Sequence, residues 1–316
     1  MPAARAEPNT ISFNAAISVC KNAGHWKRAF AQLGAMPAAR AKPDTISFNA
    51  AISACEKAGH WQLALALLGA MPAARAEPDA ISFSAAISAC HKAGHWQVAL
   101  ALLGAMPAAR AEPDAISFSA AISACEKAGQ WQRALALLGA MPAAHAEPNT
   151  ISFNAAISAC EKAGHWQLAC ALLGSMTGLR LEPNVISYSA AISACEKAAQ
   201  WRFALALFNS MTNLQLEPNA ISCNAVVSTC EKAAQWRLAI ALLGSMSNLS
   251  LEPNLVGCNA AISSCEKAAQ WQLALLLLGS MATLRLILDV ISCSAAVSAC
   301  EKAGQPVAAR LAAARR

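Results

Sequence analysis

The sequence predicts an all-α protein, an α-solenoid superhelix of about nine helix-turn-helix repeats. The first observation is a period of 35 residues that runs through the chain, and such a period is typical of stacked repeats. The second is that each unit holds two segments with apolar residues at helical spacing. The third is their length, because a helix of about 13 residues is not stable alone and must stack on its neighbours. The period is carried by every tryptophan, at positions 26, 61, 96, 131, 166, 201, 236 and 271.

Residues 45–79 illustrate the two helices of a unit. The first is predicted from about Thr45 to Lys57, because Asp44 can cap the free N–H groups and Gly59 is typical of the position after a helix end. The second is predicted from His60 and Trp61 to about Met71, because Pro72 cannot continue a helix.

The first helix of this unit has two distinct sides at about 100° per residue. One side is apolar and is the expected core face, consisting of Phe48, Ala51, Ile52 and Cys55. The opposite side is a polar stripe with one aliphatic residue, consisting of Ile46, Asn49, Ser53 and Lys57. Stacked units should therefore present the polar stripe on one shared surface.

Composition limits the class of protein and its environment. The apolar content is 56%, but no run approaches the roughly 18 apolar residues of a membrane-spanning helix, so no membrane association is predicted. The net charge of +6 permits a polyanionic partner. Nine of the 13 cysteines follow the repeat, and equivalent helices roughly 8 to 10 Å apart exceed the roughly 7 Å Cα limit of a disulfide. Reduced thiols and an intracellular location are therefore expected, and Met1–Asn9 resembles neither a secretory signal nor a transit peptide.

Catalytic and metal-binding motifs are not found. The sequence has no Gly-rich phosphate loop, no spaced Cys and His set and no acidic cluster outside the repeat, so we predict no enzyme activity, no metal and no cofactor. His60 and its equivalents alternate with glutamine, as at Gln130, and are interpreted as turn residues. Each tryptophan is expected to pack the start of the second helix against its partner helix.

The repeat resembles that of the pentatricopeptide repeat family over residues 1–304. A typical unit opens with a hydroxyl residue, an aromatic and Asn or Ser, carries Lys-Ala-Gly between its helices and ends in Pro-Asp or Pro-Asn. Cys223, Cys258 and Cys293 replace the aromatic and are interpreted as core residues. The resemblance implies a right-handed superhelix with repeats starting at 10, 45, 80, 115, 150, 185, 220, 255 and 290, after a partial repeat end at 1–9 and before a degenerate basic C-terminal cap at 305–316. The tryptophan departs from the family, which generally has an aliphatic residue there. Tetratricopeptide repeats, with 34 residues and another pattern, come second.

The resemblance implies sequence-specific binding of single-stranded RNA with one base per repeat. In the family the fifth and last residues of a repeat read the base, and the aliphatic second residue holds it. The base-reading positions of this chain are Asn14, Asp44, Asn49, Asp79, Ser84, Asp114, Ser119, Asn149, Asn154, Asn184, Ser189, Asn219, Asn224, Asn254, Asn259, Asp289 and Ser294. The clamping positions are Ile11, Ile46, Ile81, Ile116, Ile151, Ile186, Ile221, Val256 and Ile291.

The family's pairings then predict a target resembling 5′-UUGAYAYU-3′. One basic residue per unit, except in the first where Asn22 takes its place, is expected to neutralise the RNA backbone, and the set is Lys57, Lys92, Lys127, Lys162, Lys197, Lys232, Lys267 and Lys302. The resemblance further implies a chloroplast or mitochondrial location, a part in RNA processing, stabilisation or translation, and other RNA-processing proteins as partners.

Several alternatives stay open at this point. Asn and Asp before a helix are good caps in their own right, and a lysine in the last turn of a helix is favoured by the helix dipole. A helical-repeat scaffold for protein–protein interaction would share this fold, with side chains on the stripe that differ from unit to unit. A recently duplicated array without a target would share the monotonous stripe.

Overall fold

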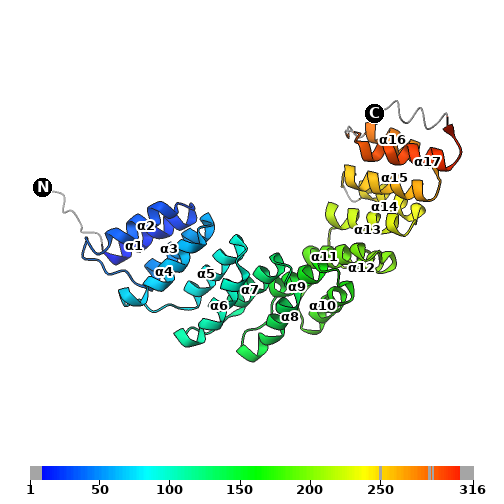
Figure 1. The fold of residues 1–316 in the computed structure, drawn as a ribbon. Coiled ribbons are helices and arrows are strands. Elements are labelled where there is room, and N and C mark those ends of the chain that lie inside the picture. Colours follow the sequence, from blue (N-terminus) through cyan, green and yellow to red (C-terminus); the bar gives the residue numbers. More distant parts are fainter. Residues whose placement is uncertain (1–8, 249–250, 284–285, 287, 307–316) are drawn as a thin grey trace. The chain divides into compact units, whose positions relative to one another are not determined.

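The computed structural model describes residues 9–248, 251–283, 286 and 288–306, and this part of the chain contains 17 α-helices and three short 3-10 helices (Figure 1). It is all-α, as predicted. Most of the expected partial repeat end and of the expected C-terminal cap, residues 1–8 and 307–316, lies outside the described residues. None of the described helices combines the length and apolar character needed to cross a bilayer.

The helices alternate between a first and a second helix of each repeat. The first helices are α1 (Thr10–Asn22), α3 (Thr45–Ala58), α5 (Ala80–Ala93), α7 (Ala115–Lys127), α9 (Thr150–Lys162), α11 (Val185–Lys197), α13 (Ala220–Lys232), α15 (Leu255–Lys267) and α17 (Val290–Lys302). The second helices are α2 (Trp26–Ala35), α4 (Trp61–Ala70), α6 (Trp96–Ala105), α8 (Trp131–Ala140), α10 (Trp166–Gly178), α12 (Trp201–Asn213), α14 (Trp236–Asn248) and α16 (Trp271–Thr283).

The first helices begin at a side-chain cap. The Asp44 carboxylate accepts from the Ser47 N–H at 2.9 Å, and the Ser47 hydroxyl accepts from the Asp44 N–H at 3.1 Å, which forms a reciprocal capping box. Gly59 ends α3 with a φ of 77°, in the left-handed region that favours glycine. Helix α3 therefore begins after Asp44 and ends before Gly59, as these two residues predicted from the sequence.

The end of the second helix depends on the residue after the repeat methionine. Pro72 starts the 3-10 turn η1 (Pro72–Ala74), and η2 (Pro107–Ala109) and η3 (Pro142–Ala144) follow in the next two repeats. Where Thr177 stands in place of this proline, α10 continues to Gly178, because the backbone N–H is available to the helix again.

The chain forms two compact units, residues 1–159 and 160–316. In the first unit α1, α3, α5 and α7 pack side by side (Figure 1). Helices α2, α4 and α6 each contact the first helix of their own repeat and of the next, and α8 contacts α7. The second unit repeats this arrangement with α11, α13, α15 and α17. In each unit the first helices lie next to one another and together form one face of the helix stack.

The core of the repeat is wider than the sequence predicts. The expected core face of α3 is buried, with Ile52 and Cys55 at 0% and 1% exposure. Ala50, Ala54 and Ser53 are buried as well, because α3 lies between α1 and α5 and is covered on both flanks. The placement of Ser53 on an exposed stripe is therefore wrong.

The cysteines follow the predicted pattern, and the structure adds a tryptophan contact between repeats that was not predicted. All 13 cysteines are free, and burial raises the pKa of the Cys55 thiol to about 11. Cys170, outside the repeating series, lies with its Sγ 3.7 Å from Cys195 Sγ. The Trp26 ring lies 4.2 Å from the His60 ring of the next repeat, measured between centroids, so these histidines join successive repeats in addition to occupying a turn.

Candidate nucleic-acid interface

The second residue of every repeat is an exposed aliphatic side chain. These nine residues lie in the first turn of the first helices, and 58% to 76% of each is accessible to solvent. These side chains are not part of the hydrophobic core, because the aliphatic residue that each first helix buries is Ile52 or its equivalent. Each unit therefore carries apolar side chains spaced one repeat apart on the face made by its first helices.

A pocket of about 240 Å³ lies between two of these aliphatic residues in the first unit. Ile116 and Ile151 line it, together with Ser119 and Asn149, the fifth and last residues of the repeat that starts at Ala115. The remaining lining residues are Ser88, His91, Ala120 and Ser123. The structure thus brings together two of the predicted clamping residues and one predicted base-reading pair around a space that offers a planar group both apolar contacts and hydrogen-bonding groups.

The fifth and last residues of a repeat contact each other. Asn14 Nδ2 donates to both carboxylate oxygens of Asp44, at 3.1 and 3.2 Å. Asn49 makes the same pair of bonds to Asp79 at 3.0 and 3.2 Å, and Asn259 Nδ2 donates to Asp289 at 3.0 Å. Where the fifth residue is serine the distance is longer, 3.5 Å for Ser84–Asp114 and 3.4 Å for Ser119–Asn149 and Ser189–Asn219.

The other predicted base-reading residues are placed as follows. Asn154 is half-buried on α9, and Asn184 caps α11, with its Oδ1 accepting from the Ser187 N–H at 3.1 Å. Asn224 is half-buried on α13, and Asn254 caps α15 by accepting from the Gly257 N–H at 3.0 Å. Ser294 is exposed, and its hydroxyl donates to the Ile291 carbonyl at 3.0 Å.

A buried serine connects the helix cap to the base-reading pair. Ser47 is inaccessible to solvent, and its Oγ lies 2.6 Å from Asn14 Oδ1 and 2.7 Å from Asp44 Oδ1. Ser82 stands in the same relation to Asn49 and Asp79, at 2.6 and 2.8 Å. Sequence reasoning missed these serines, although their spacing of three residues from the cap is that of a capping box.

The carboxylates of this network hold their negative charge. Burial alone would raise the pKa of Asp44, but hydrogen bonds from the Ser47 N–H, the Ser47 hydroxyl and Asn14 together lower it below its ordinary value. The pKa of Asp79 is lowered in the same way. Both groups are therefore ionised at neutral pH and only accept hydrogen bonds, which directs the amide nitrogen of the neighbouring asparagine toward them.

The repeated lysines are exposed, and most of them face an acid. Lys92 Nζ lies 2.9 Å from Glu56 of the preceding repeat. The corresponding pairs are Lys197–Glu161 at 2.6 Å, Lys232–Glu196 at 2.6 Å, Lys267–Glu231 at 2.7 Å and Lys302–Glu266 at 2.8 Å. Lys162 also has an interaction partner. For Lys57 and Lys127 that place holds Lys21 and His91.

His91 is a second residue that sequence reasoning missed. It stands where most repeats have glutamate, it lines the pocket beside Ser119, and its Nδ1 is buried with no hydrogen-bond partner among the described residues. Burial lowers the pKa of His91, and the positive charges of Lys127 and Lys92 lower it further. The signal in the sequence is its departure from the acid of the other repeats.

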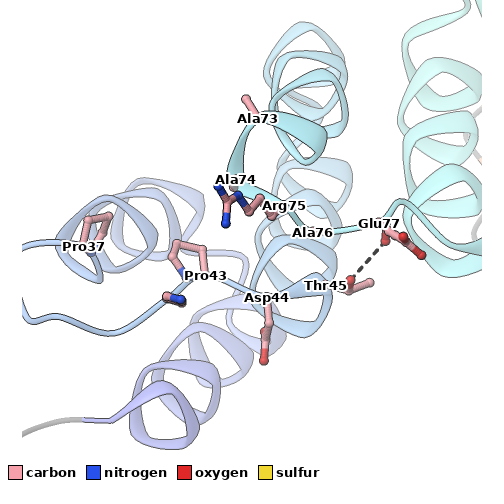
Figure 2. A pocket seen from close by; sticks show the side chains of 10 residues that line it. Pro37, Pro43, Asp44, Thr45, Ala73, Ala74, Arg75, Ala76 and Glu77 are labelled. Carbon is pink, nitrogen blue, oxygen red and sulfur yellow. Dashed lines mark hydrogen bonds between the residues drawn. The ribbon is translucent and has the colours of Figure 1, made fainter.

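An open groove of about 820 Å³ lies among the links between repeats (Figure 2). Pro37, Pro43 and Arg75 line it, and the Thr45 hydroxyl donates to the Glu77 carbonyl at 3.0 Å. The Asp44 side chain points away from the Arg75 guanidinium in this view (Figure 2). The groove lacks the pairing of aliphatic walls with base-reading residues. Within the described part of the chain, no cluster of three His, Cys, Asp or Glu side chains could hold a metal ion.

Comparison with known structures identifies the same architecture in larger proteins. Two structures of the pentatricopeptide repeat protein PPR10 in complex with an 18-nucleotide psaJ RNA element, one carrying three cysteine-to-serine changes, match with a TM-score of 0.75 and 19% sequence identity. Each match covers 99% of this chain and 45% of that chain. A structure of PPR10 from maize matches with a TM-score of 0.57 and 21% identity, over 95% and 48% of the two chains. This chain therefore spans less than half the length of the structures that it matches, and their likeness shows the fold.

Family models match along most of the chain. The model of the pentatricopeptide repeat domain matches residues 1–58, 36–93, 101–163 and 206–268. The model of the PPR repeat family matches residues 148–197, and that of the PPR repeat matches 81–109 and 186–216. No curated protein sequence matches the chain. Because the pentatricopeptide repeat domain model alone covers more than half of its residues, the chain belongs to the pentatricopeptide repeat family.

Proposed function

We propose that this chain binds single-stranded RNA in a sequence-specific manner, with one base at each repeat. The observation that carries the proposal is the pocket between Ile116 and Ile151, where Ser119 and Asn149 meet. A base seated there would have an aliphatic side chain on each face and a hydroxyl and an amide at its edge. The PPR10 structures that contain an RNA element support RNA as the ligand of this fold.

The proposed discrimination between bases comes from the hydrogen-bonding groups of each pair. An asparagine amide both donates and accepts, an aspartate carboxylate only accepts, and a serine hydroxyl is shorter and rotates. By the family's pairings, Asn with Asp selects U, Ser with Asp selects G, Ser with Asn selects A, and Asn with Asn selects a pyrimidine. The eight complete repeats then specify 5′-UUGAYAYU-3′.

The repeats that take part are proposed to start at 10, 45, 80, 115, 150, 185, 220, 255 and 290. Residues 1–9 would be a partial repeat end and residues 305–316 a degenerate cap. The chain is proposed to act by binding and not by catalysis, in a chloroplast or mitochondrion, where it would affect the processing, stability or translation of a transcript. Other RNA-processing proteins would then supply the chemistry.

The proposal is tested by titrating the protein into labelled 5′-UUGAYAYU-3′ and into its complement and measuring fluorescence anisotropy. We expect the designed target to bind at least about tenfold more tightly, since a good pair of base contacts supplies roughly 1 to 3 kcal/mol of discrimination. Equal affinity for the two oligomers would show that the assignment of bases to repeats is wrong.

A single substitution tests the code at one repeat. Ser119→Asn converts the pair in the described pocket from Ser with Asn to Asn with Asn, so the preferred fourth base should change from A to a pyrimidine. The same variant assayed with changes at the second base is the matched control, where its preference should equal that of the unmodified protein. A variant that keeps its preference for A contradicts the role of Ser119.

A protein-binding scaffold is the outcome that would replace this proposal. Capture of the tagged protein from an organelle extract, followed by sequencing of the bound RNA and mass spectrometry of bound proteins, separates the two. Enrichment of transcripts that contain the target supports RNA binding. Recovery of proteins with no enriched RNA supports the scaffold.

A further inference from the structure

The repeat that starts at Ala220 lacks the serine that links the helix cap to the base-reading asparagine in the repeats of Asn14 and Asn49. The third residue of the following first helix is Gly257, whereas the equivalent residues Ser47 and Ser82 place a hydroxyl 2.6 Å from the asparagine Oδ1 of the preceding repeat. Asn254 still caps α15 through the Gly257 N–H, but the reciprocal half of the capping box is missing.

The side chain of Asn224 occupies the space left by the missing serine. A Cβ built on Gly257 would lie 2.8 Å from Asn224 Oδ1, well inside the distance of ordinary contacts. That oxygen is buried and has no hydrogen-bond partner in the described structure. Asn259 Oδ1 also lacks a partner although Ser292 follows it, but Asn259 Nδ2 still donates to Asp289 at 3.0 Å. Among the described residues, Asn224 has neither of the two kinds of bond that fix Asn14 and Asn49.

A base-reading asparagine can select a base only if its side-chain amide has a fixed orientation, so that the oxygen and the nitrogen each face a defined side. In Asn49 the Oδ1 accepts from Ser82 and the Nδ2 donates to Asp79, so only one orientation of the amide satisfies both neighbours. Asn224 has neither a serine hydroxyl nor an aspartate carboxylate beside it, since the equivalent residues are Gly257 and Asn254. Exchanging its oxygen and nitrogen breaks no hydrogen bond to the protein, and the amide offers a base either a donor or an acceptor.

We propose that the third residue of the next repeat is a positioning residue for base selection, and that Gly257 makes the repeat of Asn224 and Asn254 tolerant of different bases at its position in the RNA. The proposal rests on the proposed RNA binding and refines it. Ser82 holds Asn49 in one orientation and gives selection of U at the second base. Gly257 releases Asn224, and the seventh base is bound with little preference.

The test compares these two repeats in the same protein. Eight oligomers, with each of the four bases at the second or at the seventh position of the target, are titrated against the unmodified chain, Gly257→Ser and Ser82→Gly. We expect about tenfold or more between the best and worst base at the second position and less than about threefold at the seventh. Gly257→Ser should raise the ratio at the seventh position alone, and Ser82→Gly should lower it at the second alone.

Gly257→Ser is sterically feasible because the atom in its way is the end of a flexible side chain. The new hydroxyl would displace Asn224 Oδ1 and then donate to it. Hydrogen exchange of asparagine side-chain amides, measured by NMR on selectively labelled protein without RNA, should be faster for Asn224 than for Asn49 and should slow in Gly257→Ser. Exchange rates that are equal for Asn224 and Asn49 would overturn the proposed difference in orientation.

The outcomes separate this inference from the proposed function. Discrimination at the second base together with equal discrimination at the seventh overturns the role of Gly257 and leaves RNA recognition standing. The absence of discrimination at both positions overturns the proposed function, and base selection through the third residue fails with it. If Gly257→Ser changed the ratio of affinities between the best and the worst base at the second position, residue 257 would not act on the repeat of Asn224 alone, contrary to the proposal.

Discussion

The lysine–glutamate pairs make a quantitative prediction for the salt dependence of RNA binding. For a single strand, the slope of log K against log salt concentration changes by about −0.7 for each phosphate that is neutralised. If about seven of the repeated lysines contacted phosphates as free cations, the slope would be near −5. Five of the described lysines lie 2.6 to 2.9 Å from a glutamate of the preceding repeat, so their charge is already balanced.

Lys57 and Lys127 differ, because the equivalent place in the preceding repeat holds Lys21 and His91. If these two lysines supply the phosphate contacts, the slope is about −1.4, from two contacts at about −0.7 each. We therefore expect a slope much shallower than −5, measured by anisotropy at a series of potassium chloride concentrations. A slope near −5 would refute the neutralisation by glutamate, and a slope near zero would refute contact with the RNA backbone.

Two substitutions locate the effect. Lys127→Gln should make the slope less steep by about 0.7, and Lys267→Gln, the matched control, should change it less because Glu231 already pairs with Lys267. Glu231→Gln should steepen the slope and tighten binding by freeing Lys267. Exposed ion pairs contribute at most about 1 kcal/mol, so these variants remain folded. Equal effects of Lys127→Gln and Lys267→Gln would contradict the explanation.

Three further predictions concern the fold. Arg75 adopts a φ of 59°, so Arg75→Gly should raise the free energy of unfolding by about 1 kcal/mol in urea titrations, whereas Gly59→Ala, at a φ of 77°, should lower it. Burial lowers the pKa of His91 in the folded protein. The contribution of its neutral imidazole to the free energy of unfolding is therefore fully present above the unfolded-state pKa of about 6.5 and is lost as the pH falls below it. His91→Gln should reduce this loss, measured as the difference between melting curves at pH 7.5 and 5.5. Burial raises the pKa of Cys90 to about 11, so a thiol reagent at pH 8 should label it in denaturant but not in the folded protein, as mass spectrometry can verify.

Local signals were sufficient to predict the helices. Asp44 begins α3, Gly59 ends it, and Pro72 begins the 3-10 turn that follows α4; each acts on backbone groups within a few residues. Because the sequence repeats every 35 residues, the helices predicted for one unit could be assigned to the equivalent residues of the other units. The core was predicted less well, because Ala50 and Ser53 are buried by neighbouring first helices and not by the periodicity of their own helix.

The candidate site was predicted in part for the same reason. The second, fifth and last positions could be named from the sequence, and the described pocket brings them together around Ser119. The contacts that control them were missed, since Ser47 meets an asparagine 33 residues earlier and Lys92 meets a glutamate 36 residues earlier. Only the stacking of repeats creates such contacts.

The last residue of a repeat serves the helix cap and the base-reading pair at once, and this double role limits which residues can stand there. Asp79 accepts from the Ser82 N–H at 2.9 Å while its carboxylate receives both bonds from Asn49. Asn caps a helix about as well as Asp, so Asp79→Asn would keep α5 and change only the groups shown to a base. Asp79→Ala would remove both, at a cost of about 0.5 to 2 kcal/mol for the cap alone. All eight last positions are Asp or Asn, so under the proposed code a repeat could alter its base preference without losing the helix cap.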